Sequence, residues 1–237
     1  NFQEQGEKMF RGPIYDLFGF IQGKDSFEMV VISFFSVLVI IMVLNPIHEC
    51  AHALTAKLLG DDTAESRGRV TLNPFAHIDP TGAVLMFLCR FGWANPVPVD
   101  LRKCRKVSIR TANILVSLAG PFSNIIMSLI IIIIIKILWL TLPDSTTMGY
   151  VTTALYLTAR ISLNLAVFNL IPIPPLDGYH VLSTFMSPKA MAFVERNAHI
   201  IRWVMLFLLV GGIIGVPLSY ASEGLYFLLD KMTFFLG

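Results

Sequence analysis

The chain has 237 residues, of which 55% are hydrophobic and 14% are charged. Soluble proteins carry about 25% charged residues, so this composition and a mean hydropathy of +0.69 exclude an ordinary soluble domain. They indicate an integral membrane protein with room for one compact helical bundle. The formal net charge of +2 gives no reason to expect a nucleic acid partner, so we use the basic residues to predict topology.

The first long apolar stretch follows a charged N-terminal extension. Residues 1–28 contain three positive and five negative residues, and we expect their segment Met9–Ile21 to lie in the membrane interface. The run Met29–Leu44 contains no charged residue. We predict a membrane-spanning helix over 29–47 that continues to Leu59, just before a glycine suited to end it.

A histidine motif lies at the end of this predicted span. His48 and His52 are four residues apart, so on a helix they share one face and can bind one metal ion together. Glu49 is adjacent to the first histidine and can act as the general base toward a water molecule that the metal activates. The pattern is typical of zinc peptidases, but here it is embedded in apolar sequence. It therefore predicts a hydrolytic zinc site inside or beside a bilayer.

Further apolar stretches predict three more spans and one shorter helix. They are 111–135, continuing to Leu140, then 151–171 and 203–222, with the shorter helix at 81–89 between the first two spans. Asp79 as N-cap and Pro80 at the first position favour the short helix, which cannot cross a bilayer. Arg160 lies inside the third span, and the sequence does not decide between an interfacial position and a buried partner.

The distribution of basic residues predicts the orientation of the chain. The segment 90–110 contains six basic residues and one acidic residue, whereas the turn at 143–149 contains only Asp144. The positive-inside rule then places the segment 90–110 in the cytoplasm and the turn outside. Counted back from there, the first helix enters from outside, and we expect the histidine motif toward its cytoplasmic end.

A third metal ligand is needed, because catalytic zinc sites use three protein ligands and leave one position for water. The third predicted span ends at three prolines in the segment 169–178 (NLIPIPPLDG), where the helix must unwind. Unwound backbone at membrane depth is tolerated where it is buried in protein or lines a wet cavity. Asp177 follows directly, on the side predicted for the histidines, so it is our candidate for the third ligand.

These motifs resemble those of the site-2 protease family of intramembrane zinc metalloproteases. The resemblance rests on the His-Glu-x-x-His motif at 48–52 and the Asn-x-x-Pro-x-Pro-x-Leu-Asp-Gly motif at 169–178. The segments 68–74 (GRVTLNP) and 119–124 (AGPFSN) also match family segments, and the matches cover about residues 29–185 in family order. No stretch resembles the PDZ or CBS domains that some members carry, so the chain resembles the short form.

The resemblance implies three core helices around one zinc ion. It implies that His48, His52 and Asp177 are the zinc ligands and that Glu49 is the general base. It also implies that Asn169 supports the oxyanion of the peptide bond under attack. From the residues alone, a helix cap before the prolines is an equally reasonable role for this asparagine.

Two short segments have the composition of β-strands. Residues 68–73 (GRVTLN) and 94–99 (ANPVPV) contain β-branched residues, and the prolines make the second an edge strand. An exposed edge beside a protease site can bind an extended substrate by strand addition. The candidate substrate-binding residues on this basis are Val70, Thr71, Leu72 and Asn73. In the segment 120–124, we favour a kink at the Gly-Pro pair, with the polar residues packed between helices.

We therefore predict an all-α polytopic membrane protein, a helical bundle with a three-helix catalytic core, short strands and a broken helix near the metal site. Its parts are the N-terminal extension 1–28, the catalytic membrane core 29–185 and the C-terminal helices 186–237. The predicted function is zinc-dependent cleavage of membrane proteins within or near a transmembrane segment, in a bacterial cell membrane. The sequence identifies no regulatory partner.

Two other functional classes are open at this point. A membrane transporter with a broken helix would account for the prolines, but not for the histidine motif. A non-catalytic protein that binds transmembrane helices would not need Glu49. Substrate cleavage that depends on this glutamate separates the protease from both classes.

Overall fold

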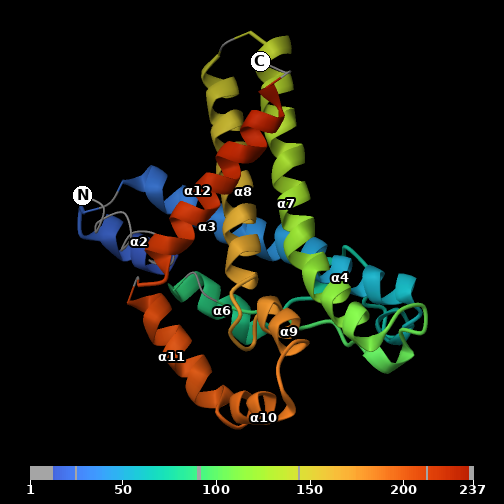
Figure 1. Cartoon of the computed structure of the whole chain (residues 1–237). Coiled ribbons are helices and arrows are strands. Elements are labelled where there is room, and N and C mark those ends of the chain that lie inside the picture. Colours follow the sequence, from blue (N-terminus) through green and yellow to red (C-terminus); the bar gives the residue numbers. More distant parts are fainter. Residues whose placement is uncertain (1–12, 25, 90–91, 144, 212, 235–237) are drawn as a thin grey trace.

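The structure is a computed structural model that describes residues 13–24, 26–89, 92–143, 145–211 and 213–234 (Figure 1). Its regular elements are all helical. They are α2 (Pro13–Ile21), α3 (Phe27–Val39), the π-helix η1 (Ile40–Leu44), α4 (Asn45–Leu59), α5 (Thr63–Ser66), η2 (Pro74–Ala76), α6 (Pro80–Cys89), η3 (Leu101–Lys103), α7 (Ile109–Thr141), α8 (Thr146–Asn169), α9 (Asp177–Ser183), α10 (Pro188–Arg196), α11 (Ala198–Val210) and α12 (Gly215–Met232). The predicted interfacial segment 9–21 lies partly outside the described residues, and its remainder forms α2.

The first predicted span is one continuous helical segment, Val30–Leu59, built from α3, η1 and α4. Proline inside a helix lacks a backbone N–H and its ring crowds the carbonyl one turn earlier. The wider π-turn directly before Pro46 accommodates this residue without ending the segment. Gly60 ends α4 with a left-handed backbone (φ 112°), which confirms its predicted role as the C-cap.

Among the residues that the structure describes, three helical segments are long and apolar enough to cross a membrane. Besides Val30–Leu59, they are Ile109–Thr141 and Thr146–Asn169, and both agree with the spans predicted from the sequence. The hydroxyl of Ser108 accepts a hydrogen bond from the Thr111 N–H and so caps the start of α7. The polytopic all-α prediction is therefore confirmed for these spans.

The predicted fourth span, 203–222, is wrong as a single helix. The structure divides it between α11, which ends at Val210, and α12, which begins at Gly215. Glycine is a poor helix former, and a proline in a helix interior destabilises the helix. Gly215 and Pro217 instead lie in the first turn of α12, where they are tolerated.

The predicted strands at 68–73 and 94–99 are also wrong, because the described residues contain no strand. An isolated antiparallel bridge joins Ile78 to Ala94. The prolines in the second segment have no N–H to donate to a ladder. The guanidinium of Arg69 donates instead to the carbonyls of Asn95 and Pro96. A side chain thus takes the place of the backbone ladder that the sequence suggested.

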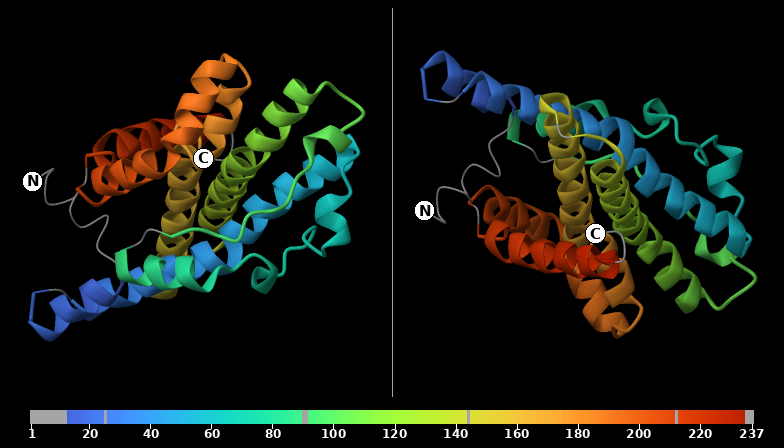
Figure 2. Two further views of the ribbon diagram at one scale, coloured as in Figure 1. Left: turned by 90° about the horizontal axis from the view of Figure 1, so that it is seen from below. Right: turned by 90° about the horizontal axis from the view of Figure 1, so that it is seen from above.

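The core lies where α7, α8 and α12 meet. The buried cluster there consists of Ile131, Ile132, Ile135, Ala159, Leu163 and Leu229. α7 and α8 run side by side and α12 packs across them (Figure 1). The α3–α4 segment crosses α7 in the view of Figure 1, and the views from above and below show α4 lying against α7 (Figure 2). This crossing places the first half of α7 against the histidine motif on α4.

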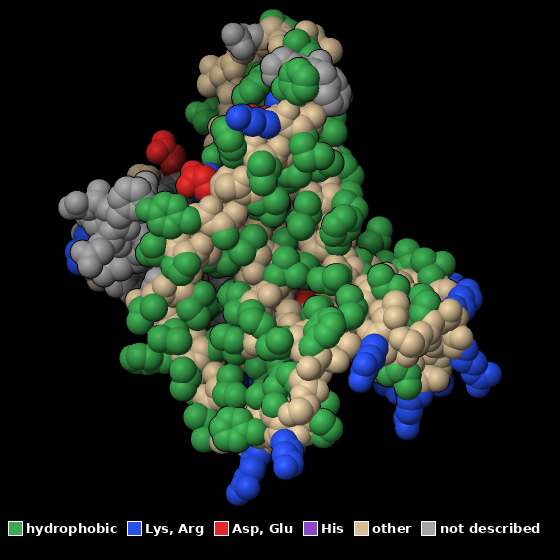
Figure 3. Space-filling model, viewed as in Figure 1, with side chains coloured by type: hydrophobic (Ala, Val, Ile, Leu, Met, Phe, Trp, Pro, Cys, Tyr) green, Lys and Arg blue, Asp and Glu red, His purple; other side chains and the backbone are tan. Residues whose placement is uncertain are grey.

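The short helix α6 packs against the π-turn. Met86 lies in a small buried cluster with Val37 and Ile41. The carboxylate of Asp79 accepts a hydrogen bond from the Gly82 N–H (2.8 Å), which confirms the predicted N-cap. Elsewhere, hydrophobic side chains cover most of the face shown in Figure 3, as a lipid-facing surface requires.

Candidate metal centre

The two histidines of α4 are buried and face each other. Their Nε2 atoms lie 3.1 Å apart, and the residues His48 and His52 are each 8% exposed. Residues four apart on a helix stand one above the other on the same face, which explains why a continuous α4 brings the two rings together. The predicted pairing of these residues is therefore present in the structure.

Asp177 completes the cluster from a distant part of the chain. Its Oδ2 lies 3.2 Å from Nε2 of His48 and 3.4 Å from Nε2 of His52. The helix α8 ends at Asn169, the proline-rich segment follows without regular structure, and Asp177 begins α9. The three residues form a group of metal-type ligand atoms.

The spacing of these atoms fits a tetrahedral zinc ion. Zinc ligands lie about 2.0–2.1 Å from the metal, so two ligands at tetrahedral positions are about 3.3–3.4 Å apart. The observed separations of 3.1, 3.2 and 3.4 Å are close to this value. Oδ2 of Asp177 is also buried and makes no hydrogen bond within the described residues, as expected for an atom kept for a metal.

The surroundings of Asp177 favour its ionised form. Burial alone disfavours a carboxylate, but the rings of His48 and His52 beside it outweigh this effect and hold the pKa of the Asp177 carboxyl below its usual range. The residue is therefore a carboxylate at neutral pH, which is the state that a metal ligand requires.

α7 orients both histidines. Nδ1 of His52 donates to the carbonyl of Val116 (2.7 Å), which leaves the lone pair on Nε2 facing the cluster. The side-chain amide of Asn124 lies 3.2 Å from Nδ1 of His48. The structure has Nδ2 of this amide toward the ring, while Oδ1 is buried without a partner among the described residues. The oxygen and nitrogen of an asparagine amide can be exchanged by a flip of the side chain. In the flipped orientation, Oδ1 of Asn124 would accept a hydrogen bond from the Nδ1–H of His48, and Nε2 of His48 would be free to bind a metal.

Gly120 lies directly against the two rings. A Cβ built on this residue would come within 2.3 Å of Nε2 of His52 and 2.6 Å of Nε2 of His48. Only glycine lets α7 approach this closely. The sequence predicts a kink with interhelical packing in this segment, and the contacts with the histidines go beyond that prediction. The available signal was the four-residue spacing of Gly120 and Asn124, which puts both on one helix face.

Glu49 is held by the backbone of a loop. Its Oε2 accepts a hydrogen bond from the Val97 N–H (3.0 Å).

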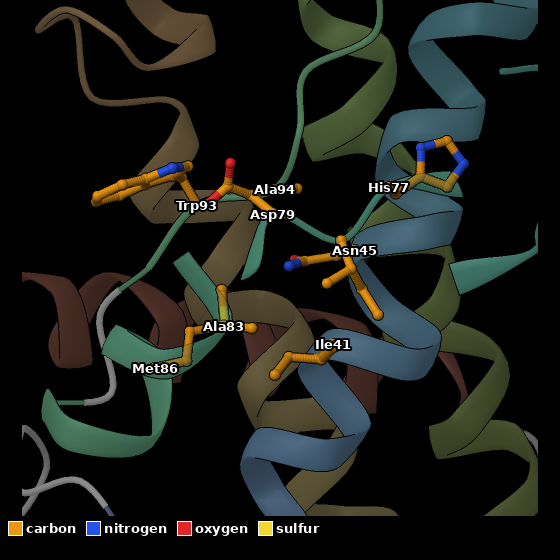
Figure 4. Close-up of a pocket in the computed structure, with 9 residues that line it drawn as sticks. Ile41, Asn45, His77, Asp79, Ala83, Met86, Trp93 and Ala94 are labelled. Atoms are coloured by element: carbon orange, nitrogen blue, oxygen red, sulfur yellow. The ribbon is translucent and has the colours of Figure 1, made fainter. Parts of the chain in front are cut away.

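Asn45, one helical turn earlier on the same face of α4, lines a small pocket together with Ile41, Ala83, Met86 and Trp93 (Figure 4). The Asn45 side chain points into this pocket, whereas the ring of His77 points away from it (Figure 4).

Two other groups of predicted site residues lie elsewhere. Nδ2 of Asn169 donates to the Leu165 carbonyl of its own helix (3.0 Å), which is the contact of a residue near a helix end. Val70, Thr71, Leu72 and Asn73 lie in the irregular segment before η2. The Thr71 carbonyl accepts from His77 and the Asn73 side chain accepts from the Phe75 N–H. The described contacts do not connect this segment to the cluster.

Apolar helices long enough to span a membrane, together with a His-His-Asp cluster beside a glutamate, define the class of membrane-embedded zinc metalloproteases. The sequence profile of peptidase family M50 matches residues 137–212. A relative in Bacillus subtilis (strain 168), "Putative zinc metalloprotease YwhC", is 38% identical over 205 residues, which cover 84% of this chain and 93% of the relative. The chain belongs to peptidase family M50, the site-2 protease family.

More distant relatives carry the same description. "Putative zinc metalloprotease Rip2" of Mycolicibacterium smegmatis is 29% identical over 166 residues, or 68% of this chain and 62% of that protein. Rip2 of Mycobacterium tuberculosis (strain Erdman) is also 29% identical, over 67% of this chain and 61% of its own. No solved structure gives a significant match. These relationships make this protein a zinc metalloprotease, as the motifs predicted.

Proposed function

We propose that the protein is an intramembrane endopeptidase that cleaves membrane proteins within or beside a transmembrane segment. The observation that carries the proposal is the convergence of His48, His52 and Asp177 on a buried point between helices that are apolar enough to span a bilayer. Ionisable side chains in such helices are costly and are kept for function. The cluster, together with family membership, favours peptide hydrolysis over transport or passive helix binding.

The three clustered side chains would hold zinc, because their ligand atoms have the spacing and the chemistry of an open His-His-Asp site. When bound, zinc supplies a Lewis acid that polarises the substrate carbonyl and lowers the pKa of water. Val116 and Asn124 keep the rings of the two histidines turned toward the metal. Such outer contacts commonly affect metal affinity by about 10–100-fold.

Glu49 acts as the general base. It follows His48 on α4, so its carboxylate lies beside the cluster without being a ligand. With Oε2 bound to the Val97 N–H, Oε1 is the oxygen that takes a proton from the attacking water. The same carboxyl then returns the proton to the amine of the departing peptide.

In this proposal, Asn169 and the segment 70–73 bind the substrate. One N–H of the Asn169 amide is bound to Leu165, and the second is available to support the developing oxyanion. In the segment 70–73, the residue Leu72 is 62% exposed, and the backbone of Val70 and Leu72 makes no hydrogen bond to the backbone of other described residues. An extended substrate can pair with such a backbone without a pre-existing strand.

The proposed location is a bacterial cell membrane with the active site toward the cytoplasm. Lys and Arg side chains gather mainly at the lower end of the molecule, around the end of α4, the start of α7 and α10 (Figure 3). The basic residues of 101–110, which lead into α7, belong to this end. The positive-inside rule favours the cytoplasmic side for it.

The test measures zinc content and substrate cleavage in the same set of variants. The parent protein, Glu49→Gln and Asp177→Ala are purified in detergent and assayed for zinc per chain and for cleavage of a single-span membrane protein. We expect about one zinc in the parent and in Glu49→Gln, and clear loss in Asp177→Ala. Cleavage should fall by a hundredfold or more in Glu49→Gln, because general base catalysis contributes about 10²–10⁴-fold. Full cleavage by Glu49→Gln would show that this residue is not the general base. Full zinc content in Asp177→Ala would show that Asp177 does not bind the same metal ion as the histidines.

A further inference from the structure

An extended segment runs along the face of α4 that carries Glu49. Residues 94–100 (ANPVPVD), which we call the cover segment, lie between α6 and η3 and follow α4 in the view from below (Figure 2). The cover segment has no regular secondary structure apart from the isolated bridge at Ala94. Its position is therefore set by contacts with other parts of the chain.

Both ends of the cover segment are fixed by hydrogen bonds. At one end, the Asn95 N–H donates to the carbonyl of His77 (2.7 Å). At the other end, the Asp100 N–H donates to Oδ2 of Asp61 (2.7 Å), a carboxylate that is fully buried. Hydrogen bonds to buried charged groups are among the stronger ones in proteins. The segment is thus held in place and is not a loose loop that lies near the site by chance.

Arg69 holds the centre of the cover segment. Its guanidinium donates to the carbonyl oxygens of Asn95 and Pro96, directly before Val97. Both hydrogen bonds come from one nitrogen, Nη2, and the rigid plane of the guanidinium group fixes the direction of its N–H groups. Arg69 therefore determines where the Val97 N–H lies.

The prolines leave few backbone donors in the cover segment. Pro96 and Pro98 have no N–H, so between residues 95 and 99 only Asn95, Val97 and Val99 carry one. The Val97 N–H is the donor that reaches Oε2 of Glu49, at 3.0 Å. One atom of the cover segment thus makes direct contact with the carboxylate of the general base.

We propose that the cover segment positions Glu49 for proton transfer and that Arg69 is the positioning residue that holds the segment. The proposal rests on the proposed function, in which Glu49 is the general base. A glutamate side chain has several rotatable bonds, and misplacement of a catalytic group by about 1 Å can cost about 100-fold in rate. The bond from Val97 fixes one carboxylate oxygen and leaves the other free for the proton.

Hydrogen exchange tests the contact without any measurement of activity. The zinc-loaded protein in detergent is compared with Glu49→Ala and Glu49→Gln, and exchange is followed by mass spectrometry in the peptide that contains residues 94–100. We expect about one amide to exchange faster in Glu49→Ala than in Glu49→Gln, because the glutamine oxygen still accepts from the Val97 N–H. Equal exchange in the two variants would overturn the proposal.

Kinetics test the role of Arg69. The probe is a single-span membrane protein with a fluorophore and a quencher on opposite sides of its transmembrane segment, reconstituted with the enzyme in vesicles. We expect Arg69→Gln to lower kcat by about ten- to a hundredfold with little change in KM and with full zinc content. Arg69→Lys should recover part of this loss. The matched control Arg67→Gln removes an exposed arginine two residues away and should behave like the parent.

A second kinetic experiment tests the backbone N–H of Val97. Val97→Pro removes the N–H, whereas Val97→Ala keeps it, so the proline variant should have the lower kcat. An unchanged kcat in Arg69→Gln, or equal kcat in the two Val97 variants, would overturn the positioning role. A parent that shows no cleavage dependent on Glu49 would instead contradict the proposed function, and hydrogen exchange would still decide the contact.

Discussion

At the scale of single residues, Gly120 determines how closely two helices approach at the metal centre. Its Cα faces the Nε2 atoms of His48 and His52, which are the atoms that would bind zinc. A methyl group at this position would occupy the space of the ring nitrogens, whose positions are also fixed by Val116 and Asn124. The glycine is therefore part of the site although it has no side chain.

Gly120→Ala should displace the histidine rings and reduce zinc content well below one per chain, with a matching loss of cleavage. The matched control is Gly224→Ala, since Gly224 also lies in a helix and a Cβ there would meet nothing within 4 Å. Zinc analysis of both purified variants is the measurement. Full zinc content in Gly120→Ala would show that the rings can move aside.

The sequence was sufficient to predict the three clustered residues, because each has a local signal. His48 and His52 have helical spacing, and Asp177 follows prolines that must unwind a helix. The four-residue spacing of Val116, Gly120 and Asn124 indicates a shared face of α7, but not that this face contacts the histidines. These contacts depend on where α7 crosses α4, and the crossing point of two helices is set by packing, which residue spacing does not specify.

At the scale of elements, local pattern predicted helices better than it predicted strands. The cap of α6 at Asp79 and the C-cap of α4 at Gly60 have local side-chain or backbone causes, and both are in the structure. The strand prediction failed because β-structure needs a partner with free backbone groups. The segment 94–99 instead contacts the backbone of His77 and the side chains of Glu49 and Arg69, all distant in the sequence.

The charges inside the predicted spans join helices to each other. Arg160, which the sequence left unassigned, is within 3.1 Å of the Tyr156 hydroxyl and 3.3 Å of Glu223 on α12. Lys136 on α7 is buried and donates to the carbonyls of Asp230 and Thr233 at the end of α12. A cation at a helix C-terminus satisfies carbonyls that have no partner within the helix.

Lys136→Met should therefore weaken the attachment of α12. The carbonyls of Asp230 and Thr233 would lose a charged donor, and we expect destabilisation of roughly 1–3 kcal/mol. Thermal unfolding of the detergent-purified protein measures it. Lys231→Met, which removes a cation near the same helix end, should change stability by less than about 0.5 kcal/mol. Equal melting temperatures for the two variants would contradict this role of Lys136.

At the scale of the whole molecule, the uneven distribution of charge implies one orientation in the membrane. Residues 101–110, which carry five of the six basic residues of the segment 90–110, and residues 145–149 lie at opposite ends of α7. The positive-inside rule therefore predicts that the basic end faces the cytoplasm and that the turn faces outward. The metal centre lies in the half of α7 nearer the basic end.

Single cysteines in a background without the three native ones test this orientation. We expect a membrane-impermeant maleimide to label Thr147→Cys in intact cells and to label Arg105→Cys only after lysis. Both positions are exposed, so denatured samples should label equally and serve as the control. Labelling of Arg105→Cys in intact cells would reverse the orientation.

The length of α7 also provides a measure of depth. Its 33 residues span about 50 Å, whereas the hydrocarbon layer is about 30 Å thick. Gly120 lies about 15 Å along the axis from Arg110, the last basic residue before the apolar run. Consider a substrate helix that enters the membrane from the same side as the start of α7. Its peptide bonds about ten residues beyond the charged residues at its membrane boundary would lie at the depth of Gly120. The first half of α7 would then act as a ruler that selects where, along a membrane anchor, the chain is cut.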